Sequence, residues 1–464
     1  MTLAVAICLY ALMAVIATIK PRAGVVLIWF AIWLYPNTLL YGLLPFGIRL
    51  DDILVVYVFI LCMWRGRDQI PRGTVVNLAL AWMVIQLIGN IWGAFLTPYT
   101  PVTSIFKFLC KSTYVPMTAI ILSYSLKTRE DIKFYATWLC IAGGAAALLG
   151  IATVYFPHQL DIFFIPRNEL MTNNYADTLE NMDELSRRAT GSIGIVATAL
   201  ILVNLTLLSM SRWFFDNKKL SAKLLYAVCT IVCMVGLMYT QTRGAMLAVG
   251  VAMLWGLFFS KKKSAFGYLI LVGVLIALLE PGIRDVVIAR FTGETGVNLA
   301  AGMNTRLGVW NVFDKKFNPL FLLSGIGMSS SQALYSITAH STYLGALVYE
   351  GVLGLGLLVV MVVKAWSLAG RLLARTGDAL IGSLGAYLRM LTIAMLVLGV
   401  SSESFQTVLG VQLFFAGMIL AERVLEPTSE TAPVPKEMFR LSDLRMWLRG
   451  RSIWAASKSL FRAR

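Results

Sequence analysis

Charge is scarce in this chain. Only 14% of its 464 residues are charged and 58% are hydrophobic, whereas roughly a quarter of a soluble domain is charged. The alternation of apolar and polar residues that marks β-barrel strands is also missing, and the apolar runs are too long for such strands. These absences exclude an ordinary soluble domain and an outer-membrane barrel. They leave an all-α, polytopic helical membrane protein.

Cysteine is absent from the two longest polar segments. All six cysteines lie inside apolar runs, namely Cys8, Cys62, Cys110, Cys140, Cys229 and Cys233. No disulfide framework is therefore expected to hold the polar segments together.

Apolar runs close to the length needed to cross hydrocarbon recur along the chain. We expect them near 2–19, 23–42, 51–64, 74–96, 104–126, 133–156, 192–211, 223–240, 244–260, 265–280, 341–363, 379–400 and 404–422. They predict about 12 or 13 crossings, since the run at 51–64 is short and the first hairpin is ambiguous.

Basic residues fall on alternate connections between these runs. The clusters are Lys20/Arg22, Arg65/Arg67/Arg72, Lys127/Arg129/Lys133, Arg212/Lys218/Lys219/Lys223, Lys261–Lys263 and Lys364/Arg371/Arg375. The positive-inside rule makes these connections cytoplasmic. The long loops at about 157–191 and 281–340 are then on the opposite face. The net charge of +16 belongs mostly to this cytoplasmic belt, which fits anionic lipid headgroups and requires no nucleic acid.

The chain is expected to divide into two parts. Residues 1–423 form the transmembrane part with its two long loops. Residues 424–464 form a cytoplasmic tail, which begins with a Pro-rich linker to about 437. Beyond it, apolar and arginine positions suit either a basic amphipathic helix on the membrane surface or a disordered basic end.

One of the two histidines lies where the second long loop meets an apolar run. His340 begins the sequence His-Ser-Thr-Tyr-Leu. Because imidazole changes charge near neutral pH, a histidine at a membrane surface can act as a base. The alternative is a residue that merely hydrogen-bonds to loop backbone at a helix start.

Arginines on the face with few positive charges form the second group of candidates. Arg187 and Arg188 precede a helix, Arg243 lies between two apolar runs, and Arg306 lies in the second loop. Guanidinium groups match phosphate oxygens and stay charged at any relevant pH. Arg243 can instead snorkel to lipid headgroups, and Arg187 can pair with the nearby acids.

Acidic residues give weaker signals. Asp177, Glu180, Asp183 and Glu184 have a spacing that suits a metal–diphosphate site, but it equally suits one solvated helical face. Asp51 and Asp52 either join the site or simply begin a helix, where its dipole favours acids. No metal or cofactor is expected.

Taken in order, these motifs resemble those of the bacterial O-antigen ligases, within the wider ligase and polymerase superfamily. The elements that carry the resemblance are Arg188-Ala-Thr-Gly191, Thr-Arg-Gly-Ala at 242–245, Arg306-Leu-Gly-Val-Trp310, Gly325-Ile-Gly327, His340-Ser-Thr-Tyr-Leu344, Glu350-Gly351 and Gly354. They cover roughly 186–354. The chain departs from the family pattern after Gly191, where Asn-Pro-Asn is missing, and the doublet Arg187-Arg188 leaves the first arginine's assignment open by one position.

The resemblance implies a GT-C-like, metal-independent glycosyltransferase of the inner membrane with a periplasmic active site. Its donor would be a polysaccharide on undecaprenyl diphosphate, and its acceptor a sugar hydroxyl on the lipid A core. Arg188 and Arg243 would bind the diphosphate, His340 would activate the hydroxyl, and Arg306 would have a less defined role. A single displacement would invert the anomeric centre.

Other functions remain open at this point. A polymerase or a protein O-oligosaccharyltransferase would use the same donor, so the candidate residues do not discriminate among the three. A transporter of lipid-linked sugar is favoured less, because such proteins carry internal repeats and deep ionisable residues. The sequence shows no clear repeat and has few charges near the middle of its apolar runs.

Overall fold

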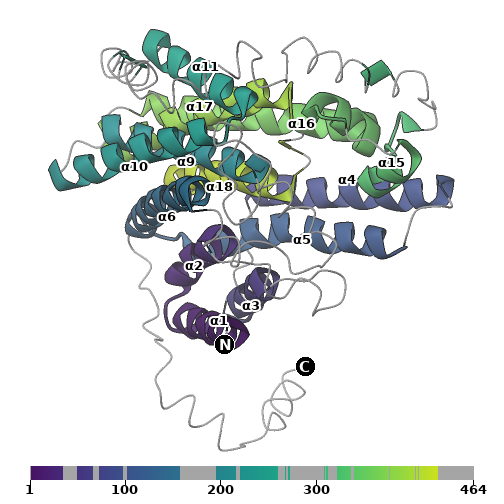
Figure 1. Ribbon diagram of the computed structural model, residues 1–464, viewed down its shortest axis with the longest axis horizontal. Coiled ribbons are helices and arrows are strands. Elements are labelled where there is room, and N and C mark those ends of the chain that lie inside the picture. Colours follow the sequence, from purple (N-terminus) through teal and green to yellow (C-terminus); the bar gives the residue numbers. More distant parts are fainter. Residues whose placement is uncertain are drawn as a thin grey trace, which may run out of the picture. The chain divides into compact units, whose positions relative to one another are not determined.

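The computed structural model describes residues 2–34, 50–65, 73–97, 102–156, 195–215, 220–259, 267, 270–271, 308, 310–311, 321–335, 339–375, 377–402, 404–405 and 407–426. Within these ranges the chain is helical and contains no strand. The helices are α1 (Thr2–Ile19), α2 (Pro21–Leu34), α3 (Leu50–Arg65), α4 (Thr74–Leu96), α5 (Val102–Ser125), α6 (Arg129–Tyr155), α9 (Ile195–Phe215), α10 (Leu220–Tyr239), α11 (Arg243–Phe259), α15 (Gly327–Tyr335), α16 (Thr342–Ala374), α17 (Ala379–Gly399) and α18 (Val408–Leu425) (Figure 1).

The prediction of a helical membrane protein is confirmed. Among the described residues, seven helices are long and apolar enough to cross a membrane, namely Thr74–Leu96, Arg129–Tyr155, Val196–Phe215, Leu220–Tyr239, Thr342–Ala374, Ala379–Gly399 and Val408–Leu425. Shorter apolar helices include Ile7–Ile19, Pro21–Trp33 and Arg243–Phe258. The total of 12 or 13 crossings stays a prediction, because the run at 265–280 lies mostly outside the described residues. The predicted tail beyond Glu426 also lies outside them.

Two helices differ from the sequence expectation. Helix α16 was expected to end near 363 but continues to Ala374, because its last turns bury Leu368 and Leu372 beside α17. The second long loop contains α15, a short helix rich in serine. It packs on α4 and α16, so tertiary contact stabilises a segment that lacks a long apolar run.

Helix α9 forms the centre of the described bundle. It contacts α6, α10, α11, α17 and α18, and Figure 1 shows it among these helices. Two of its buried polar side chains, Asn204 and Ser209, pair with neighbouring helices. The Tyr387 hydroxyl donates to Asn204 Oδ1 at 3.0 Å, and Thr230 Oγ1 donates to Ser209 Oγ at 3.0 Å. Outer helices instead expose apolar side chains, such as Val84 and Ile88 of α4, as a lipid-facing surface requires.

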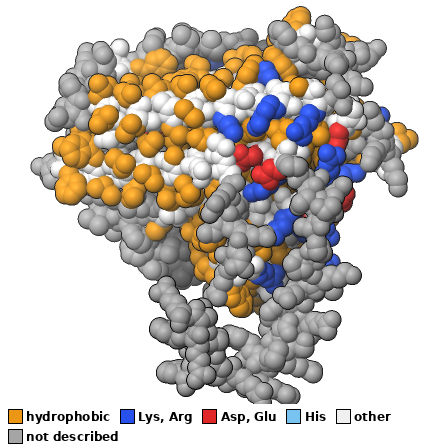
Figure 2. Space-filling view, turned by 180° about the vertical axis from the view of Figure 1, so that it is seen from behind, with side chains coloured by type: hydrophobic (Ala, Val, Ile, Leu, Met, Phe, Trp, Pro, Cys, Tyr) orange, Lys and Arg blue, Asp and Glu red, His pale blue; other side chains and the backbone are white. Residues whose placement is uncertain are grey.

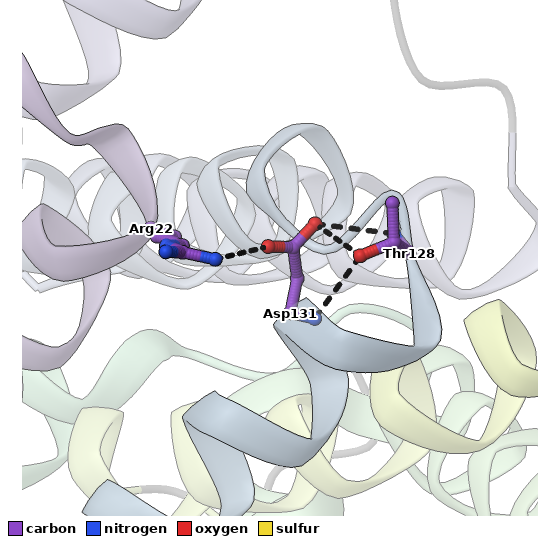
Figure 3. A network of polar contacts seen from close by, with 3 residues as sticks. All are labelled: Arg22, Thr128 and Asp131. Atoms are coloured by element: carbon purple, nitrogen blue, oxygen red, sulfur yellow. Dashed lines mark hydrogen bonds and ion pairs between the residues drawn. The ribbon is translucent and has the colours of Figure 1, made fainter.

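Ion pairs join several helix termini at one end of the bundle. Arg22 at the start of α2 lies 3.4 Å from Asp131, which also closes a capping box with Thr128 at the start of α6 (Figure 3). Arg129 pairs at 2.6 Å with Asp378, the N-cap of α17. These contacts bring the starts of α2, α6 and α17 together.

The same end contains residues of five more helices. Arg65 at the end of α3 donates to the Thr18 carbonyl of α1 at 2.6 Å. Glu422 of α18 lies 3.9 Å from Lys364 of α16 and accepts from the Val75 N–H of α4 at 3.3 Å. We call this region the basic end. Figure 2 shows Lys and Arg side chains gathered in one part of the surface with Asp and Glu between them, whereas hydrophobic side chains cover much of the rest.

Candidate functional site

His340 lies at the opposite end of α16 from Lys364 and precedes the N-cap of that helix. Its side chain is exposed, and its backbone has a φ of 50°, in the left-handed region. The backbone of the preceding residue, Ala339, is held by two hydrogen bonds. The Ala339 N–H donates to the Tyr349 hydroxyl at 2.9 Å, and the Trp310 indole donates to the Ala339 carbonyl at 3.1 Å. The imidazole is therefore presented outward from a backbone that is held on its N-terminal side.

The two residues after His340 attach it to the connection between α17 and α18. Ser341 Oγ donates to the Gly399 carbonyl at 3.3 Å. Thr342 Oγ1 donates to the Ser402 carbonyl at 2.9 Å and accepts from the Phe405 N–H at 3.3 Å. The hydroxyls of the His-Ser-Thr motif thus dock the start of α16 on the segment between Gly399 and Phe405, which we call the α17–α18 turn.

Arg243 is the first residue of α11 and is half-buried. The residue two positions earlier, Gln241, has a φ of 52° and makes the sharp turn between α10 and α11. The residue after Arg243 packs on the α17–α18 turn, because a Cβ added to Gly244 would lie 2.2 Å from Ser401 Oγ. A side chain at 244 would force the Ser401 hydroxyl to move, so glycine allows this close approach.

The α17–α18 turn therefore receives the starts of both α11 and α16. Gly244 contacts it at Ser401, and Thr342 contacts it at the neighbouring Ser402. Arg243 and His340, far apart in sequence, lie beside these two anchor points. In the described chain, the non-glycine residues with positive φ are Gln241 and His340. Backbone strain of this kind tends to gather at functional sites.

The Gly-Ile-Gly motif supports α16 from the other side. Gly325, Gly327 and Gly351 all have φ between 67° and 68°, and Gly351 makes a kink inside α16. Across the kink, the Ile326 N–H donates to the Val348 carbonyl at 3.0 Å. A Cβ on Gly351 would lie 2.4 Å from the Leu323 backbone. Gly325 and Gly351 are required because two backbones meet there without room for side chains, whereas a Cβ on Gly327 would lie 2.5 Å from the Asn90 Cα of α4.

Glu350 is a buried carboxyl inside the membrane part of the chain, with 3% of its surface exposed. Gln86 Nε2 of α4 donates to its Oε1. A Cβ on Gly354 would lie 2.5 Å from Glu350 Oε2, so this glycine leaves space for the carboxyl. Sequence analysis did not assign Glu350 a role. Its signal was a lone acid within an apolar run, a pattern that marks functional sites in membranes.

A cavity of about 300 Å³ opens between α2, α3, α4, α5, α9, α15, α16 and α18. Its polar lining includes Asp51, Asp52, Gln86, Lys111, Tyr349 and Gln412. Asp51 and Asp52 occupy the first turn of α3, so their positions fit both alternatives raised from the sequence. The cavity is not evident from the sequence, since eight helices build it.

The cavity adjoins the structures that hold His340. Tyr349 forms part of its wall and accepts the hydrogen bond from Ala339, the residue before His340. Thr407, also in the wall, caps α18 directly after the α17–α18 turn. Gln86 connects the wall to Glu350.

Of the predicted site residues, the structure brings His340 and Arg243 to one turn, while Arg187, Arg188 and Arg306 lie outside the described residues. The acidic run from Asp177 to Glu184 also lies outside them. Where the structure is described, no group of three or more His, Cys, Asp or Glu residues has a metal-binding arrangement. No protein-family model matches the chain, and no curated protein matches it significantly.

Proposed function

We propose that the chain is an O-antigen ligase: a metal-independent, inverting glycosyltransferase of the bacterial inner membrane. It transfers a polysaccharide from undecaprenyl diphosphate to a sugar hydroxyl of the lipid A core, on the periplasmic side. The observation that carries the proposal is the docking of the starts of α11 and α16 on one α17–α18 turn. This places an arginine and an exposed histidine beside the same turn.

The location of this turn agrees with the predicted orientation. Arg243 begins α11 and His340 directly precedes the N-cap of α16, whose later part reaches the basic end through the pairing of Lys364 with Glu422. If the basic end is cytoplasmic by the positive-inside rule, the two residues face the periplasm. Lipid-linked polysaccharide is expected to be presented on that side.

The proposed reaction is one displacement at the anomeric carbon. The acceptor hydroxyl attacks that carbon while its proton passes to the neutral imidazole of His340. The bond between the anomeric carbon and the diphosphate oxygen breaks, and undecaprenyl diphosphate leaves with both electrons. Arg243, together with Arg188, stabilises the developing charge as a preorganised cation. General-base help of this kind is typically worth roughly 10²–10⁴-fold in rate.

A transfer assay in a strain that lacks its own O-antigen ligase tests the proposal. Wild-type chain should restore lipopolysaccharide ladders on a gel. His340→Asn should abolish them at equal membrane expression, because asparagine tolerates the left-handed backbone but supplies no base. Arg243→Ala should also abolish them.

The matched control for Arg243→Ala is Arg129→Ala at the basic end. Arg129 forms an ion pair that is about half exposed, so its loss should leave the ladders intact. Absence of ladders with wild type, while polymer stays on its lipid carrier, would point to another acceptor, such as a growing polymer or a protein. Ladders that survive both site variants would contradict the proposed residue roles.

A further inference from the structure

The cavity between α3, α4, α5 and α18 combines three kinds of group in a small space. Carboxylates come from Asp51 and Asp52, amides from Gln86 and Gln412, and an aromatic face from Trp82. Carboxylate and amide groups accept or donate paired hydrogen bonds, which suits vicinal hydroxyls. Aromatic faces pack against the C–H face of a sugar ring. With about 300 Å³, the cavity is at the small end of the range for ligand sites.

Charge argues against the diphosphate as occupant. Two carboxylates, Asp51 and Asp52, line the cavity with one ammonium, that of Lys111. Both aspartates are buried, with 2% and 8% of their surfaces exposed. A dianionic group would meet a net negative wall in a medium of low dielectric constant, where like charges repel strongly. An uncharged ligand rich in hydroxyls avoids this cost.

The position of the cavity assigns it to the acceptor side of the reaction. Tyr349 contributes to the cavity wall and holds the Ala339 peptide next to His340. Arg243 instead approaches the α17–α18 turn from α11. A sugar in the cavity is thus near the segment that positions the proposed base.

We propose that this cavity binds an uncharged sugar ring of the acceptor and presents one of its hydroxyls toward His340. That the bound sugar belongs to the acceptor rests on the proposed function. The binding of an uncharged sugar in the cavity can be measured independently of that function. Trp82 packs against the ring, and Asp52 accepts hydrogen bonds from its hydroxyls.

The test is calorimetric titration of the purified full chain in detergent, without donor. The probe is core oligosaccharide released from lipopolysaccharide and dephosphorylated. Wild type should bind it saturably. Asp52→Asn, which keeps the side-chain shape, and Trp82→Leu should each weaken binding at least about 10-fold, or 1.4 kcal/mol.

Trp92→Leu is the matched control, since Trp92 lies on the same helix but is 41% exposed and does not line the cavity. It should bind as wild type does. Equal binding by wild type and both cavity variants would overturn the inference, as would a wild type that fails to bind. Because no donor is present, binding that depends on the cavity while transfer fails would count against the proposed function alone. Transfer without such binding would count against the cavity alone.

Discussion

Gln241 and His340 hold their backbones in a region that costs residues with side chains about 1–3 kcal/mol. Each is followed by a contact with the α17–α18 turn, through Gly244 and through Thr342. The tertiary contacts stabilise conformations that the local sequence does not favour. At His340 the result is an exposed imidazole whose neighbours on both sides are fixed.

Glu350 and Gln86 form a buried polar pair whose partners are 264 positions apart in sequence. Replacing Gln86 by leucine removes the donor and leaves a buried carboxyl without this bond. We expect Gln86→Leu to lower the free energy of unfolding by about 1–3 kcal/mol. The double variant Gln86→Leu/Glu350→Leu should recover part of the loss, since an apolar pair needs no hydrogen bond.

Thermal unfolding of the purified chain in detergent measures this effect, with the two single variants completing a double-mutant cycle. Val84→Ala is the control, because Val84 lies on the same helix with 44% of its surface exposed. A Gln86→Leu variant as stable as wild type would show that the pair contributes nothing.

At the scale of elements, α16 is divided by its kink at Gly351. The first part carries the His340 end and packs against residues 321–326, and the second part reaches the basic end. The Val352 N–H donates to the Leu322 carbonyl at 2.8 Å, so the interrupted helix finds a backbone partner outside itself. Inside a membrane, a backbone N–H that loses its helical hydrogen bond must find another partner within the protein.

Gly351→Ala should therefore destabilise the chain. Residue 351 has a φ of 68°, and a Cβ there would lie 2.4 Å from the Leu323 backbone. The unfavourable backbone conformation alone should lower the free energy of unfolding by about 1–3 kcal/mol. Gly356→Ala in the same helix is the matched control. Its Cβ would meet nothing within 4 Å, and alanine favours a helix over glycine by about 1 kcal/mol.

The two variants are compared by their unfolding temperatures in detergent and by membrane expression. We expect a lower temperature for Gly351→Ala only. Equal temperatures for both variants would mean that the kink tolerates a side chain, in contradiction to the described packing.

At the scale of the whole molecule, charge distinguishes the two ends of the membrane part. Ion pairs and arginine–carbonyl contacts gather at the basic end, whereas the α17–α18 turn marks the other. Because cytoplasmic connections retain lysine and arginine, we expect these ends to lie on opposite sides of the membrane.

Cysteine labelling tests that orientation in a variant whose six native cysteines are replaced. Val400→Cys lies at the α17–α18 turn and Ala374→Cys at the basic end, and both positions are exposed. A membrane-impermeant maleimide should label Val400→Cys in spheroplasts and Ala374→Cys only after lysis. The reverse pattern would place His340 in the cytoplasm and remove the basis for a periplasmic reaction.

The sequence by itself determined the helices of the membrane part. Apolar runs must become helices in a bilayer, because lipid offers backbone groups no hydrogen-bond partners. Most predicted runs accordingly match the described helices within a few residues, and the basic clusters at Arg22, Arg65 and Lys364 meet at one end. Motif residues at 243 and 340 were also recognisable, since charged and ionisable groups stand out beside apolar runs.

Only the tertiary structure decided which of these residues meet. The docking of Thr342 on Ser402 spans 60 positions, and the cavity takes side chains from eight helices. Local periodicity specifies which residues share a helix but not which helices pack together. The role of Gly351 likewise depends on the Leu323 backbone, which is brought from elsewhere in the fold, because close packing is a property of the assembled bundle.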